Sequence, residues 1–135
     1  NLTFTGFIPN QNLPLYQSSA DILLMPYSRS IMGSSGTADS GIVASPMKMF
    51  EYMAAGRPLL ASNMPIVREL VREDVDGLLF SPNDPDDLAR QTLSLLNDLS
   101  LSQRLAASAS ERALTKFTWH ESQKKLAHVY DKLLS

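Results

Sequence analysis

Short apolar runs alternate with segments of helical periodicity along the chain. Residues 2–7 alternate apolar side chains with threonine, which predicts a strand with one buried face. Residues 22–25 form a continuous apolar run closed by Pro26, which predicts a strand buried on both faces. Two further short runs, 59–61 and 77–80, predict two more strands.

Helices are predicted between these strands and after the last one. The first covers 12–20, the second begins at Ser45, and the third covers 64–71 with Asn63 as its N-cap. Strand–helix alternation followed by a helical tail predicts an α/β domain with a parallel sheet. An acidic cap and two capping boxes divide the tail into three consecutive helices: Asp84 with Pro85, Ser100 with Gln103, and Thr118 with Glu121.

The segment 45–58 carries the clearest start and stop signals of any predicted helix. Ser45 suits the N-cap and Pro46 the first helical position. Gly56 suits the left-handed residue after the last turn, and Pro58 prevents the helix from continuing. The residues predicted to share the apolar face of this helix are Met47, Phe50, Met53 and Ala54.

The polar face of this helix could hold a phosphorylated ligand. The helix follows the 22–25 strand and a Ser- and Gly-rich loop, 28–41, and ligands of parallel sheets bind beyond the carboxyl ends of the strands. Ser45 with its neighbouring N–H groups, and Lys48, could bind phosphate. Glu51 could accept hydrogen bonds from ribose hydroxyls. On spacing alone, an exposed ion pair between Lys48 and Glu51 is the simpler interpretation.

Composition narrows the class of protein further. The chain has 135 residues, 44% of them hydrophobic and 19% charged, which is typical of one globular domain. A net charge of −2 without a basic tract argues against a nucleic-acid partner. Without cysteine or a metal-binding motif such as HExxH, we expect no metal site. Neither a membrane span nor a signal peptide is recognisable, and we expect a cytoplasmic protein.

Residues 50–58, Phe-Glu-Tyr-Met-Ala-Ala-Gly-Arg-Pro, lead directly into Leu-Leu-Ala-Ser at 59–62. This run resembles the donor-binding motif Glu-Ala-Met-Ala-x-Gly-x-Pro-Val of the retaining glycosyltransferases with the GT-B fold, family 4, also called glycosyl transferases group 1. The resemblance extends over nearly the whole chain. The other segments that match the family in order are 3–7, 19–26, 77–80 and 117–119.

The resemblance implies a role for each candidate site residue. The intact protein would transfer a sugar, with retention and without a metal, from a nucleotide-diphosphate sugar to a sugar, lipid or glycan acceptor. Glu51 would hold the ribose hydroxyls of the donor, and Lys48 and Ser45 its diphosphate. Phe7 and Ile8 would lie near the nucleobase through backbone contacts.

Two departures from the family pattern limit what the resemblance implies. Many members carry two glutamates eight positions apart, the first directed at the transferred sugar, but Val43 stands in that first position here. We also expect residues 1–135 to be an incomplete C-terminal donor domain of partial Rossmann-like architecture, without the acceptor domain and the first strands. In the strand order 3-2-1-4-5-6, the 2–7 strand would not neighbour the 22–25 strand. It would pair differently, or a second chain would cover the exposed edge in an oligomer.

Several properties are left open by the sequence. No catalytic residue is assigned, and any association with the inner face of a membrane would go through the missing domain. The chain alone is expected to be inactive. The alternatives are a nucleotide-sugar epimerase of the same fold and a non-catalytic nucleotide-binding or protein-docking module.

Overall fold

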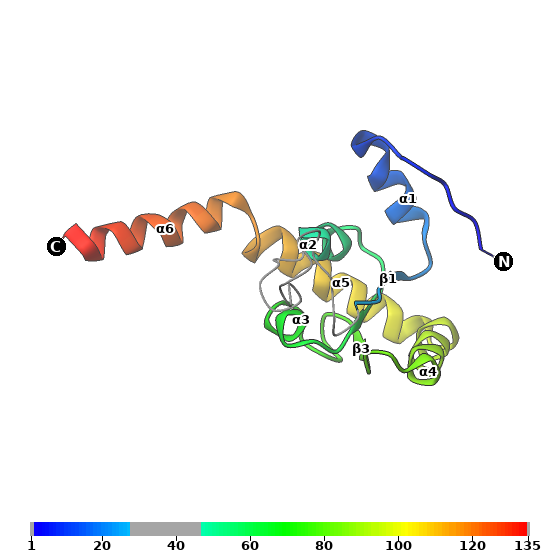
Figure 1. The fold of residues 1–135 in the computed structure, drawn as a ribbon. Helices are drawn as coiled ribbons and strands as arrows, with labels where there is room; N and C mark the ends of the chain where they lie inside the picture. Colours follow the sequence, from blue (N-terminus) through cyan, green and yellow to red (C-terminus); the bar gives the residue numbers. More distant parts are fainter. Residues whose placement is uncertain (1, 28–46, 135) are drawn as a thin grey trace, which may run out of the picture.

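A parallel sheet with helices on both faces forms the body of the computed structural model, which describes residues 2–27 and 47–134 (Figure 1). The strands are β1 (Leu23–Met25), β2 (Leu59–Ser62) and β3 (Leu78–Phe80), in that order across the sheet. The helical elements are η1 (Asn10–Asn12), α1 (Leu13–Ser19), α2 (Met47–Ala54), α3 (Pro65–Leu70), α4 (Pro85–Asn97), α5 (Leu99–Lys116) and α6 (Trp119–Leu134).

The sheet confirms the predicted α/β class and three of the predicted strands. β1 pairs with β2 in parallel, with Leu23 beside Leu59, and β2 pairs with β3 in parallel, with Leu60 beside Leu78. Strands that follow one another in the chain are therefore neighbours in the sheet. The predicted loop 28–41 lies outside the described residues.

The strand predicted at 2–7 is wrong for this chain. The segment is an extended coil before η1, and Leu2, Phe4 and Phe7 are between 78% and 90% exposed. A strand requires a neighbour to accept and donate its backbone hydrogen bonds. Among the described residues, the sheet contains only β1, β2 and β3, and none of them pairs with this segment. The 2–7 segment therefore has the alternating pattern of a strand but no strand to pair with among the described residues.

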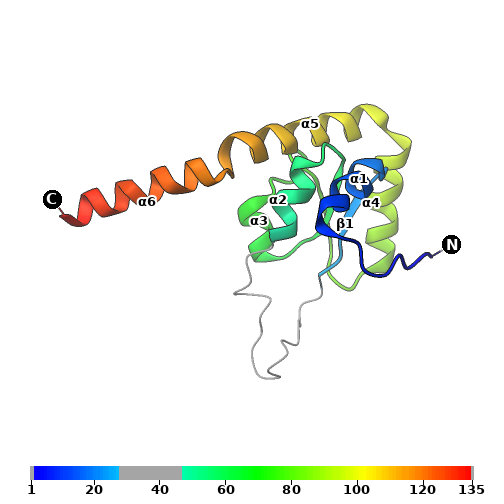
Figure 2. The same ribbon diagram turned by 90° about the horizontal axis from the view of Figure 1, so that it is seen from above.

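Two apolar clusters hold the helices to the two faces of the sheet (Figure 2). One cluster joins all three strands to α2, α3 and the second half of α5. The other joins β2 and β3 to α4 and the first half of α5. Leu24 of β1 points to the face covered by α4. It stays 40% exposed, because the apolar cluster on that face does not extend to β1.

Helix α2 packs on α5 with a face that differs from the predicted one. Met49 and Met53 are fully buried, whereas Met47 is 61% exposed. The two buried methionines are four residues apart and belong to the same cluster as Ala109 and Ala113 of α5. The small alanine side chains allow the two helices to approach closely. The predicted face was correct for Met53 and wrong for Met47 and the exposed Ala54.

Two of the predicted N-caps are confirmed. The Asp84 carboxylate accepts a hydrogen bond from the N–H of Asp87 at 2.9 Å, and the Thr118 hydroxyl accepts one from Glu121 at 3.2 Å. Gly56 adopts a φ of +69°, as expected for the residue that ends α2.

Two other predicted caps are wrong, and the cap predicted at Ser45 lies outside the described residues. The cap of α5 is Asp98 rather than Ser100, since the Asp98 carboxylate already accepts from Leu101 at 2.9 Å and favours the positive end of the helix. Helix α3 begins after Met64 rather than Asn63. The Asn63 N–H donates instead to Phe80 at the edge of the sheet, at 2.7 Å, and the Asn63 side chain accepts from Arg68.

Helix α6 projects away from the body in both views (Figures 1 and 2). No residue of α6 is buried, and Trp119 is 81% exposed, so this side chain does not anchor the helix to the body of the chain. Other apolar residues exposed on α6 are Leu126, Val129, Tyr130 and Leu133. None of the helices within 2–27 and 47–134 is long and apolar enough to cross a membrane.

The burial of the α2 methionines predicts a large loss of stability for one substitution and almost none for a similar one. Met49→Ala leaves a cavity between α2 and the sheet and should lower the free energy of unfolding by about 2–5 kcal/mol. Met47→Ala, two residues away on the exposed side, should change it by less than about 0.5 kcal/mol. Chemical denaturation of both variants measures the difference. Equal losses would show that the orientation of α2 is wrong.

Candidate functional site

The predicted polar site lies on the exposed side of α2. Lys48 and Glu51 are both exposed, on the side of the helix away from the buried Met49 and Met53. Helix α2 follows β1 in the chain, so the first turn of α2 faces the carboxyl end of the sheet. Ligands of parallel sheets bind at that end. Ser45, the third candidate, lies outside the described residues.

Glu51 is linked to α1 rather than to Lys48. Its carboxylate accepts a hydrogen bond from the Gln17 side chain at 3.4 Å. Nearby, Arg57 donates from its Nε to the backbone oxygen of Ser18 at 2.7 Å. These two bonds fasten the end of α1 to α2 and the loop that follows it. Among the interactions of the described residues, none pairs Lys48 with Glu51, which removes the simple ion-pair interpretation.

The two residues expected near a nucleobase are not brought to α2. Phe7 is 90% exposed, on the coil before η1, and Ile8 is half-buried. Within the described part of the chain, no hydrogen bond or ring contact joins either residue to α2. A role for Phe7 and Ile8 in nucleobase binding therefore stays a prediction.

A cavity of about 260 Å³ lies at the carboxyl ends of all three strands. Its lining is mainly apolar and includes two aromatic rings, beside a few hydroxyl, amide and carboxylate groups. None of the lining residues was predicted as part of a site, although a position directly after a strand was a usable signal. They are Pro26, Tyr27, Ser62, Phe80, Asn83, Asp84, Pro85 and Leu88.

This cavity is connected to α2 through two tyrosines. Burial, and then the neighbouring Tyr52 of α2, raise the pKa of the Tyr27 phenol, so Tyr27 is neutral and can donate a hydrogen bond at physiological pH. Ser62 donates from its hydroxyl to the backbone oxygen of Met25 at 3.4 Å. This bond joins the ends of β1 and β2 beneath the cavity. Tyr27 and Tyr52 also pack against the same apolar cluster, the one that holds α2 to the sheet.

The family of this chain is shown by its match to a family model. The family model described as "Glycosyl transferases group 1" matches residues 1–98, well over half of the chain. This chain belongs to the group 1 glycosyl transferases. Its three parallel strands and flanking helices are part of the GT-B fold of that family.

Named relatives and solved structures agree with the assignment to group 1. The chain is 28% identical to the amylovoran biosynthesis glycosyltransferase of Erwinia amylovora over 95% of its own length and 30% of the relative's. It resembles the sucrose-phosphate synthase structure from Thermosynechococcus elongatus with a TM-score of 0.77 at 26% identity, over 98% of this chain and 30% of that one.

A second similar structure contains a nucleotide. The HepE protein of Anabaena, solved in complex with UDP and glucose, matches 96% of this chain and 32% of its own, with a TM-score of 0.74 and 19% identity. At that identity the likeness concerns the fold. The group 1 chain described here spans about 30% of the length of the curated relatives that it matches.

The strongest charged network of this group 1 domain centres on Asp76, which is fully buried. Arg72 donates to both carboxylate oxygens, from Nε at 2.8 Å and from one terminal nitrogen at 2.7 Å. Arg112 donates at 2.7 Å and Ser108 at 3.1 Å. Burial alone would raise the pKa of Asp76, but these hydrogen bonds outweigh it and lower the pKa to about 2.

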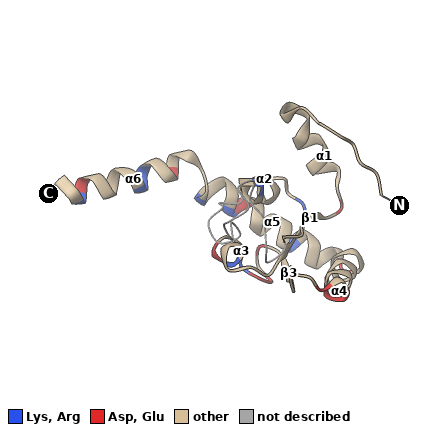
Figure 3. Cartoon of the chain, in the orientation of Figure 1, with Lys and Arg blue, Asp and Glu red and all other residues tan. Residues whose placement is uncertain are grey.

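A smaller group of the same kind surrounds Asp87, a second buried carboxylate, which accepts from the Ser81 N–H at 2.7 Å and pairs with Arg90. Charged residues of both signs are spread over α3, α4, α5 and α6 (Figure 3). Across the described ranges, no group of three or more His, Asp or Glu side chains is arranged to hold a metal ion. The Asp76 network was not predicted from the sequence, because Arg112 lies 36 residues from Asp76 in the chain.

The lowered pKa of Asp76 predicts how the stability of the domain depends on pH. The pKa of Asp76 falls from 3.8 to about 2 on folding. Above pH 4, ionised Asp76 therefore adds about 2 kcal/mol to the free energy of unfolding, and this stabilisation is lost as the pH falls through 2. The difference in unfolding free energy between the wild type and Asp76→Asn should therefore shrink over this range. Asp21→Asn, at an exposed position, serves as the control. A difference that stays constant down to pH 2 would contradict this account of Asp76.

Proposed function

We propose that this chain is the donor-binding, C-terminal domain of a glycosyltransferase that uses a nucleotide-diphosphate sugar. The observation that carries the proposal is the position of Lys48 and Glu51. Both are exposed on α2, a helix anchored to the body of a group 1 domain by Met49 and Met53. A rigid helix can hold a cation and a carboxylate in fixed positions before the ligand arrives, which lowers the entropic cost of binding.

Each side chain has a stated role in this proposal. Glu51 accepts hydrogen bonds from the ribose hydroxyls, because an ionised carboxylate is an acceptor only. Lys48, in the first turn of α2, donates to the diphosphate together with Ser45 and the N–H groups that precede the helix. Phe7 and Ile8 contact the nucleobase through their backbone. The UDP in the similar HepE structure supports a nucleoside diphosphate as the ligand class.

The same charges support a transfer that needs no metal. As the bond between the sugar and the diphosphate breaks, negative charge develops on the leaving phosphate, and Lys48 with the helix N–H groups stabilises it. The order of the family 4 motifs supports retention of configuration at the sugar. Neither the acceptor nor the catalytic residues are assigned. We place the intact protein in the cytoplasm, with any contact to the inner face of a membrane made by the acceptor domain.

Two substitutions test the donor site in the intact protein. Glu51→Gln should weaken the binding of UDP or GDP, whichever binds, by about tenfold, since it removes charged hydrogen bonds to the ribose. Removing the 2′-hydroxyl of the nucleotide should weaken wild-type binding and have much less effect on Glu51→Gln. Lys48→Gln should weaken the binding of a nucleoside diphosphate much more than the binding of the corresponding nucleoside. Calorimetry measures all of these affinities.

Glu73→Gln and Lys125→Gln are matched controls, because each removes the same charge from an exposed position away from α2. Neither should change nucleotide affinity. If the control variants and the α2 variants have equal affinity for the nucleotide, the assignment of the donor site to α2 is wrong. Binding without any turnover of nucleotide sugars by the intact protein would favour the non-catalytic module instead.

The 135-residue chain by itself should not transfer sugar. Catalysis in a two-domain glycosyltransferase requires an acceptor held against the donor, and we place the acceptor site outside this chain. An assay with labelled nucleotide sugars should detect product from the intact protein and none from the chain alone. Product formed by the isolated chain would overturn the division between donor and acceptor parts.

A further inference from the structure

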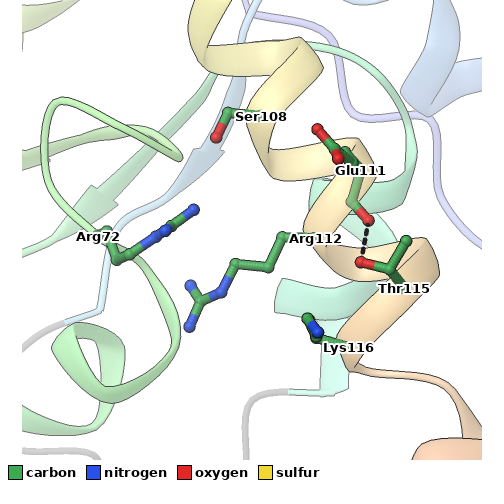
Figure 4. A pocket seen from close by; sticks show the side chains of 6 residues that line it. All are labelled: Arg72, Ser108, Glu111, Arg112, Thr115 and Lys116. Carbon is green, nitrogen blue, oxygen red and sulfur yellow. Dashed lines mark hydrogen bonds between the residues drawn. The ribbon is translucent and has the colours of Figure 1, made fainter.

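A second group of cations lies at the other end of the sheet from the first turn of α2. Arg72 is in the connection between α3 and β3, which leads to the amino end of β3. Arg112 and Lys116 lie on α5, one turn apart. They border a cavity of about 230 Å³ (Figure 4). Its lining consists of Arg72, Ser108, Glu111, Arg112, Thr115 and Lys116.

The two arginines are held in place before any ligand arrives. The buried Asp76 carboxylate binds one side of each guanidinium, with three hydrogen bonds between 2.7 and 2.8 Å. The Arg112 guanidinium also lies over the Phe117 ring, 4.9 Å from its centre, and donates to the backbone oxygen of Leu70. Their remaining N–H groups take part in no hydrogen bond within the described part of the chain. These donors are available to a ligand in the cavity.

The charge around the cavity is positive although the chain as a whole is negative, at −2. Three cations, Arg72, Arg112 and Lys116, line the cavity beside the carboxylate of Glu111, and both arginines are paired with Asp76. Asp76 is fully buried beneath the arginines, and Glu111 is exposed at the rim. Lys116 makes no hydrogen bond or ion pair with Asp76 in the described part of the chain. It lies in the last turn of α5, where the helix dipole favours a cation.

We propose that this cavity binds a phosphate group, either as the free ion or as part of a small phosphorylated molecule. Planar guanidinium groups donate paired hydrogen bonds that fit phosphate oxygens, and a third cation favours a dianion over a carboxylate. Thr115 donates its hydroxyl to the backbone of Glu111 at 2.8 Å and therefore contributes no donor. The site is separate from Lys48 and Glu51, which lie on α2, and it does not depend on the function proposed for them.

Calorimetry on the intact protein tests the proposal, with inorganic phosphate and ribose 5-phosphate as probes at about pH 8, where phosphate is a dianion. Lys116→Gln should weaken binding by about threefold, the effect of losing a partly exposed charge. Glu111→Gln should strengthen binding by a similar factor, because it removes a repelling carboxylate. Arg72→Gln should weaken binding by about tenfold, and thermal unfolding then checks that the variant is folded.

Three further variants complete the experiment. Lys125→Gln removes an exposed cation from α6 and should leave phosphate binding unchanged. Lys48→Gln and Glu51→Gln are measured beside it, because phosphate that binds at the donor site proposed on α2 would be lost in those two variants. Tighter binding of ribose 5-phosphate than of inorganic phosphate would identify an organic phosphate as the ligand, and equal binding would identify the free ion. The proposal is overturned if the wild type shows no saturable binding. It is also overturned if Lys116→Gln and Glu111→Gln bind like the wild type, or if only the α2 variants lose phosphate.

Discussion

The packing of α2 between the sheet and α5 is the contact on which the rest of the structure depends. Met49 and Met53 are completely removed from solvent, and burying two such side chains stabilises the fold by about 3–6 kcal/mol in total. The contact also fixes the rotation of the helix, with Phe50 tilted against Phe117 at a ring distance of 5.0 Å. That rotation turns Lys48 and Glu51 outward. Without it, neither charge would have a defined direction.

The two ends of the sheet differ in what they present to a ligand. The carboxyl end combines the α2 charges with a cavity lined by Tyr27 and Phe80, and its polar groups are mostly hydroxyls and amides. The amino end has the Asp76 network, in which buried charge is fully compensated by hydrogen bonds. The first arrangement brings aromatic rings and a few polar groups to the edge at which ligands of parallel sheets bind. The second holds arginines rigidly, which suits structural support and binding of an anion.

Local signals in the sequence predicted most of the elements but not how they pack. Asp84 before proline and Gly56 after a helical turn act within a few residues, so their roles can be predicted from neighbours alone. The choice between Met47 and Met49 for the buried face depends on α5, which lies about fifty residues further along. The 2–7 segment has the alternation typical of a strand, but it forms none, because no strand of the described sheet pairs with it. Asp76 is fixed by residues before and after it in the chain, and no local motif marks it.

The charges on α2 were predicted as a site, and the structure supplies what the spacing could not. Glu51 is oriented by Gln17 from a different helix, and Lys48 is not its partner. The most direct test of the account is a crystal structure of the intact protein with bound UDP or GDP. We expect the ribose hydroxyls within hydrogen-bond distance of the Glu51 carboxylate and the diphosphate at Lys48. A nucleotide bound without contact to α2 would contradict the account.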